Sequence, residues 1–175
     1  NQKGPAIASR LVSGSVRFVS RFASVKLRRA RRLQGRNPYG ILCHLMRVQI
    51  LPSLLAADYG CFAEEIRRVA DAGADALHLD IMDAHFVPNL SFGPDMVALA
   101  RRVSPGLTRN VHLMMTSPDR YLDRFIEAGA QALQIHVEAD CDIRQALDAI
   151  RARGVRAGLV ARPQTPAETL FPYLP

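Results

Sequence analysis

From residue 48 onward, short β-rich segments alternate with longer amphipathic segments, and this alternation constrains the fold more than any other feature of the chain. In the first long segment, Phe62, Ile66 and Val69 are spaced three and four residues apart, as on one face of a helix. Regular strand–helix alternation with short links is typical of a parallel sheet with helices outside it. We expect strands at 48–53, 76–82, 108–115, 132–138 and 155–161, and helices at 58–72, 92–103, 118–128, 142–153 and 165–174.

Capping residues predict where several of these helices begin and end. Asp, Ser and Thr side chains accept hydrogen bonds from the first turn, and glycine adopts the left-handed conformation that ends many helices. We expect Asp58, Ser117 and Thr165 to begin helices, and Gly73, Gly129 and Gly154 to end them. Two architectures fit the repeated units, an open doubly wound sheet and a β/α barrel. Neither a dinucleotide fingerprint nor a phosphate-binding loop follows the first strand, where the chain reads LPSLLAAD.

The expected strands carry polar side chains on one face. Because side chains alternate between the faces of a strand, residues two apart share a face. The leucines of strand 76–82 fill the face expected to pack beneath the helices. The sets on the opposite face are His78, Asp80 and Met82; Asn110, His112 and Met114; Gln134, His136 and Glu138; and Gln49, Leu51 and Ser53.

Two imidazoles and a carboxylate on neighbouring strands predict a metal site. His78, Asp80 and His112 suit a divalent ion such as Zn, Fe, Mn or Co, and an ion would offset the cost of burying them. The C-terminal ends of barrel strands are also where catalytic groups lie. The alternative is a buried His–Asp hydrogen-bonded pair without metal. His136 alone, or His85 alone, is interpreted as structural.

The segment DAHFVPN follows strand 76–82 and should form a loop above this face. Asp83 has two interpretations, contact with a substrate or capping of the turn. Phe86 and Pro88 are expected to shape a wall or lid.

The basic character of the chain belongs to residues 1–47, which hold 11 of its 23 Lys and Arg and none of its 16 Asp and Glu. In order of preference, we interpret this segment as disordered or spurious, with a natural start at Met46; as an organelle transit peptide; or as a nucleic-acid arm. Residues 48–175 are then the partial β/α-barrel domain. No apolar segment approaches the roughly 20 residues that cross a bilayer. The three cysteines are expected to be reduced thiols.

Several motifs, in order and spacing, resemble the ribulose-phosphate 3-epimerase family. They are PSLLAAD (52–58), HLDIMDAHFVPNLSFGP (78–94), VHLM (111–114), IHVE (135–138) and AGLVARPQTP (157–166). The resemblance covers residues 48–175 and implies a TIM-type (β/α)8 barrel, of which about five βα units are present. It also implies interconversion of D-ribulose 5-phosphate and D-xylulose 5-phosphate by metal-assisted proton transfer at C3 through an enediolate.

The resemblance assigns roles to particular residues. It implies that Asp80 is both an acid/base carboxylate and a metal ligand, and that His78 and His112 are metal ligands. Ser53 is similar to a substrate contact, as is His112, and Met82 and Met114 are similar to apolar groups that pack near the enediolate. The cofactor would be one divalent metal ion, and the ligand a small sugar phosphate.

Three positions depart from the family pattern. Ala84 replaces a usual Gly, Asn110 a usual Asp, and Arg162 a usual Asn. Ala84 would perturb its loop if that position needs positive φ. The family's second catalytic Asp, which is also its fourth metal ligand, and its phosphate-binding loops lie on later strands. We therefore expect the 175 residues alone to be an inactive fragment of the enzyme.

Alternative functions remain open from the sequence. They are a hexulose-6-phosphate 3-epimerase, an inactive remnant or partner-binding half barrel, and, from the basic segment alone, a nucleic-acid binder. We expect neither a membrane nor nucleic acid as a partner, and we expect the full-length protein to be a homo-oligomer. The expected location is the cytoplasm, or an organelle if residues 1–47 are a transit peptide.

Overall fold

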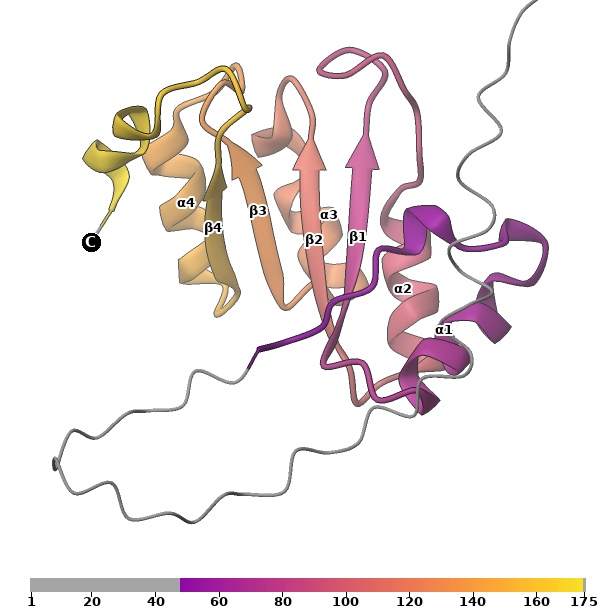
Figure 1. Ribbon diagram of the computed structural model, residues 1–175. Helices are drawn as coiled ribbons and strands as arrows, with labels where there is room; N and C mark the ends of the chain where they lie inside the picture. The colour runs from indigo at the N-terminus through magenta and orange to yellow at the C-terminus, as the bar shows by residue number, and fades with distance from the viewer. Residues whose placement is uncertain (1–47, 175) are drawn as a thin grey trace, which may run out of the picture.

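The computed structural model describes residues 48–174, and its centre is one sheet of four parallel strands (Figure 1). The strands are β1 (Ala76–Met82), β2 (Thr108–Met114), β3 (Ala132–His136) and β4 (Arg156–Val160), in the order β1-β2-β3-β4. A doubly wound sheet reverses its strand order at a switch point, whereas a β/α barrel keeps the order of the chain. The described sheet is therefore consistent with part of a TIM-type α/β barrel. The basic segment 1–47 and its three interpretations lie outside the described residues.

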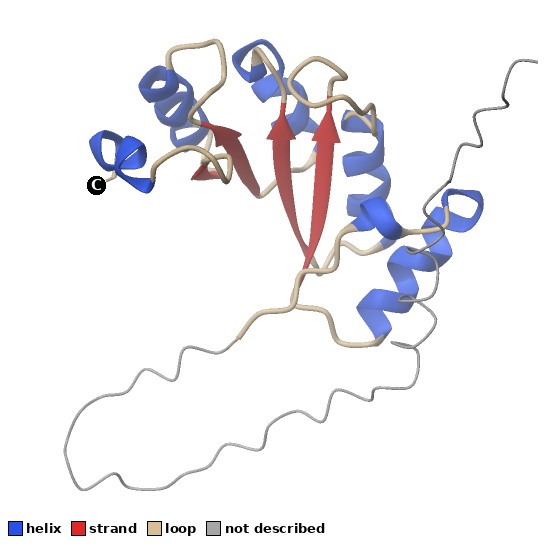
Figure 2. Ribbon diagram, turned by 45° about the horizontal axis from the view of Figure 1, so that its top comes forward, coloured by secondary structure: helices blue, strands red, loops and turns tan. Residues whose placement is uncertain are grey.

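Four α-helices lie along one face of the sheet (Figure 2). They are α1 (Phe62–Asp71), α2 (Pro94–Val103), α3 (Leu122–Ala128) and α4 (Ile143–Ala152). Leu77 and Leu79 of β1 are fully buried against them, in a core that also contains Val97 of α2 and Ile150 of α4. No helix within residues 48–174 combines the length and hydropathy needed to cross a bilayer.

The predicted helix ends are correct in some places and wrong in others. The Asp58 carboxylate accepts a hydrogen bond from the Gly60 N–H, and Gly129 ends α3 with a φ of 111°. Ser117 makes no capping bond, and the turn after it is a 3-10 helix, Pro118–Tyr121, that leads into α3. The predicted helix 165–174 is also a 3-10 helix, Ala167–Tyr173, and it contains Pro172.

The predicted strand at 48–53 is an extended segment beside β1 and is not a strand of the ladder. It touches β1 through one parallel bridge between Ser53 and His78, in which the His78 N–H donates to the Pro52 carbonyl at 3.0 Å. Pro52 has no N–H to donate, and the Ile50 N–H bonds to the Asp75 side chain at 2.9 Å. The segment therefore runs along the edge of the sheet and delivers Ser53 to its polar face.

Candidate metal centre

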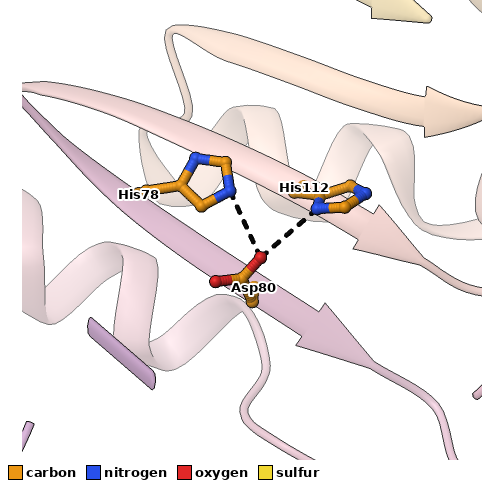
Figure 3. A group of neighbouring side chains, drawn as sticks. All are labelled: His78, Asp80 and His112. Atoms are coloured by element: carbon orange, nitrogen blue, oxygen red, sulfur yellow. Dashed lines mark hydrogen bonds and ion pairs between the residues drawn. The ribbon is translucent and has the colours of Figure 1, made fainter. Parts of the chain in front are cut away.

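Strands β1 and β2 bring His78, Asp80 and His112 together on the face of the sheet opposite the helices (Figure 3). His78 and Asp80 are two residues apart on β1 and so share a face, and the parallel register places Asp80 beside His112. Asp80 Oδ1 lies 3.2 Å from His78 Nε2 and 3.3 Å from His112 Nδ1. The three residues predicted from the sequence thus meet at one point, and their role as ligands stays a prediction.

Hydrogen bonds hold the Asp80 carboxylate ionised at the centre of this cluster. Ser53 Oγ donates to Asp80 Oδ2 at 2.5 Å, so Oδ2 is fixed while Oδ1 faces both imidazoles. Burial alone would raise the pKa of Asp80, but hydrogen bonds to the carboxylate, including the one from Ser53, outweigh burial and hold the pKa well below its usual range. The negatively charged Asp80 Oδ1 and the two imidazole nitrogens, His78 Nε2 and His112 Nδ1, therefore face the same space.

The donor set fits a divalent metal. One donor atom from each residue lies within 4.8 Å of the other two. Donors that share a tetrahedral ion at 2.0–2.2 Å lie roughly 3.4 Å from one another, which is close to the two N–O distances here. Two imidazole nitrogens and a carboxylate oxygen match the ligands of zinc and of several other first-row ions. The cluster is thus compatible with one divalent ion.

Met82 and Met114 lie one register step from the cluster, toward the C-terminal ends of the strands. They face each other across β1 and β2, and both are half-buried on the polar face. The Asn89 amide contacts the Met82 sulfur at 3.3 Å. This position suits the predicted apolar contact with a substrate above the cluster, and that role stays a prediction.

The loop after β1 is fixed by Asp83. Its Oδ1 accepts the N–H groups of His85 and Phe86, and its Oδ2 accepts the N–H of Thr116 at 2.8 Å. Of the two sequence interpretations, the structure shows the turn cap. His85 contacts the Asp83 carbonyl within the loop and is not part of the metal-ligand group found among the described residues.

A second line of polar groups, which sequence reasoning missed, starts at His112. His112 Nε2 lies 2.8 Å from His136 Nε2, and His136 Nδ1 lies 3.1 Å from Glu138 Oε2. Burial alone would raise the pKa of Glu138, but bonds from the Thr165 hydroxyl, the Arg162 N–H and His136 outweigh burial and hold the pKa at about 2. The shared face of His136 and Glu138 was a signal for this contact, although His136 was interpreted as structural.

Arg162 and Phe86 cover this second line. The Arg162 guanidinium stacks over the Phe86 ring at 4.0 Å and donates to the Phe86 carbonyl at 2.6 Å. The Phe86 ring in turn packs on the His136 imidazole, with ring centroids 4.7 Å apart. The departure at Arg162 therefore ties the loop after β1 to the end of β4.

Comparison with known proteins agrees with this geometry. Residues 49–174 match the family model described as the ribulose-phosphate 3 epimerase family. The chain is 46% identical over 123 residues to a ribulose-phosphate 3-epimerase from Rhodobacter capsulatus, covering 70% of this chain and 54% of that protein. It is 42% identical over 123 residues to the ribulose-phosphate 3-epimerase of Bacillus subtilis (strain 168), covering 70% of this chain and 56% of that protein. The chain spans about half the length of the curated relatives that it matches.

Proposed function

Because the chain belongs to the ribulose-phosphate 3-epimerase family, we propose that the protein interconverts D-ribulose 5-phosphate and D-xylulose 5-phosphate. The observation that carries the proposal is the meeting of His78, Asp80 and His112 on the open polar face of a sequentially ordered parallel sheet. Imidazole and carboxylate groups at the C-terminal half of such strands are placed for acid/base chemistry on a bound substrate.

In this proposal Asp80 is the base that removes the proton from C3. The proton moves from C3 to the Asp80 carboxylate, and the electron pair of the broken C–H bond forms the C2–C3 double bond of an enediolate. The hydrogen bonds to Asp80 keep the carboxylate ionised, as a base must be, and the bond from Ser53 fixes its orientation. Inversion also needs a second acid on the other face of the carbon, which the family resemblance assigns to an Asp on a later strand.

His78, Asp80 and His112 would hold the divalent metal. When bound there, the ion would act as a Lewis acid for the negative charge that develops on the substrate oxygens. Met82 and Met114 would exclude water from the same region, because their side chains lie next along the polar face.

We also propose a cytoplasmic location and a homo-oligomeric state for the whole protein. The location is supported by Cys61 and Cys141, which are both free thiols in the described part of the chain. The oligomeric state rests on the family resemblance, and sedimentation of the whole protein would test it.

Exchange of the C3 proton with solvent tests the function. Protein expressed from the complete gene should incorporate deuterium from D2O at C3 of D-ribulose 5-phosphate, as followed by NMR. Asp80→Asn should reduce this exchange by roughly 100-fold or more, because the amide cannot accept the proton. Asp71→Asn, the same change at an exposed position of α1, should leave the rate unchanged. Exchange at the wild-type rate in Asp80→Asn would refute the role of this carboxylate. A hexulose 6-phosphate offered in parallel should turn over more slowly.

A further inference from the structure

His112 is linked to Glu138 through His136 by a continuous line of side-chain contacts. The two Nε2 atoms of the imidazoles lie 2.8 Å apart, and the far nitrogen of His136, Nδ1, lies 3.1 Å from Glu138 Oε2. The other end of His112, Nδ1, faces Asp80 at 3.3 Å. The line therefore joins the candidate metal cluster to a carboxylate in the turn just after β3.

Glu138 determines which ring nitrogens donate and which accept in these contacts. An ionised carboxylate only accepts hydrogen bonds, and Glu138 Oε1 is already held by the Arg162 N–H at 2.8 Å and by the Thr165 hydroxyl. These two donors leave Oε2 toward His136, so His136 Nδ1 must carry the proton that it donates. A neutral imidazole has one donor and one acceptor, and His136 Nε2 is then an acceptor.

The same rule fixes the tautomer of His112. Because His136 Nε2 accepts, His112 Nε2 must donate across the 2.8 Å contact. His112 Nδ1 then bears a lone pair and no proton, because the 2.8 Å contact with His136 takes the ring proton in preference to the longer 3.3 Å contact with Asp80 Oδ1. This is the nitrogen that faces Asp80 and the candidate metal position. Metal-bound histidines commonly donate their other ring N–H to a neighbour, which orients the ring and makes the ligand more basic.

We propose that His136 and Glu138 are positioning residues that hold His112 in the tautomer able to bind metal through Nδ1. The inference rests on the proposed metal site and adds two residues to it, neither of which is a ligand. His136 is only 6% exposed and is packed beneath the Phe86 ring, so solvent does not compete for its nitrogen atoms.

Glu138→Gln tests the inference because it is nearly isosteric and should reverse which atom donates in each hydrogen bond between residues 138, 136 and 112. The amide oxygen of the substituted side chain would keep the Oε1 position, where the Arg162 N–H and the Thr165 hydroxyl need an acceptor. The amide NH2 would then face His136 Nδ1 and turn it into an acceptor. His136 Nε2 would donate to His112 Nε2, and the proton of His112 would move to Nδ1, where it blocks coordination.

Zinc affinity of the 175-residue chain gives the first readout, measured by competition with a chelator. Glu138→Gln should weaken Zn²⁺ binding by about 10- to 100-fold. The control Glu127→Gln, the same change at an exposed position of α3, should bind as the wild type does. Equal affinity in wild type and Glu138→Gln would overturn the inference while leaving the metal site intact. A wild type that binds no Zn²⁺ would overturn the metal site and this inference together.

The ring nitrogens give a second readout that needs neither activity nor metal. In ¹⁵N NMR spectra of the metal-free wild-type chain, the His136 proton should be on Nδ1 and the His112 proton on Nε2. In Glu138→Gln both protons should move to the other nitrogen. A His136 proton on Nε2 in the wild type would overturn the inference, even if the variant fails to fold.

Discussion

Ala84 has a backbone conformation that only glycine adopts without cost. Its φ is 62°, and it is the only residue other than glycine with positive φ among residues 48–174. Its N–H donates to the Asn89 carbonyl at 2.9 Å, which closes the loop after β1. The family resemblance pointed to glycine at this position, and the structure gives the physical reason. A Cβ in the left-handed region costs roughly 1–2 kcal/mol.

Ala84→Gly should therefore stabilise the protein. The relief of backbone strain exceeds the additional chain entropy of glycine, and the free energy of unfolding should rise by roughly 0.5–1 kcal/mol. Ala72→Gly is the matched control, because Ala72 has a φ of −70° and glycine there should be destabilising. Urea denaturation measures both. A loss of stability in Ala84→Gly would show that the loop conformation carries no strain.

At the same scale, the sequence predicted the cluster residues better than their neighbours. His78 and Asp80 share a face of β1 by simple alternation, and the parallel register with β2 places His112 beside Asp80. The contact between His112 and His136 does not follow from strand geometry, since it depends on how the two rings turn across β2 and β3. The alternation of polar and apolar residues predicts which face of the sheet a side chain lies on. Its hydrogen-bond partner also depends on side-chain rotamers and packing.

At the scale of elements, the loop after β1 is tied to the end of β2 by one carboxylate. Asp83 accepts three backbone N–H groups, two within its own turn and one from Thr116. Burial alone would raise the pKa of Asp83, but these three donors outweigh burial and lower the pKa below its ordinary value. The carboxylate therefore contributes stability above its unfolded-state pKa, near pH 4, and loses it as the pH falls through the folded-state value.

Asp83→Asn should test this contribution through its pH dependence. The amide NH2 would face the Thr116 N–H, and the free energy of unfolding should fall by about 1–3 kcal/mol at neutral pH. The difference from wild type should shrink as the pH is lowered below about 4, because the wild-type carboxylate then becomes protonated. Denaturation of both proteins at several pH values measures this difference. A difference that does not change with pH would contradict the account.

The sequence predicted the bounds of β1 accurately, but it was wrong about the segments beside the first strand and after the last. The prediction of strand 76–82 matches β1 residue for residue. The segment 48–53 has the composition of a strand, but Pro52 and the bond from Ile50 to Asp75 keep it out of the ladder. Thr165 was predicted to cap a helix, and its hydroxyl instead bonds to Glu138. In both places a tertiary hydrogen bond, which local sequence does not encode, contributes to the error.

At the scale of the whole molecule, the sheet has one apolar face under helices and one polar face. All-parallel sheets normally have both faces covered, and a barrel achieves this by closing on itself. The sequence alone left the choice between a barrel and a doubly wound sheet open. The sequential strand order and the placement of the helices on one face agree with the barrel of the epimerase family (Figure 2).

Anomalous X-ray scattering from a crystal of the chain grown with Zn²⁺ would test the metal site most directly. We expect a peak at the zinc edge within about 2.0–2.2 Å of His78 Nε2, Asp80 Oδ1 and His112 Nδ1. The result that would contradict it is a fully loaded crystal in which zinc lies elsewhere and these three side chains keep only their bonds to one another.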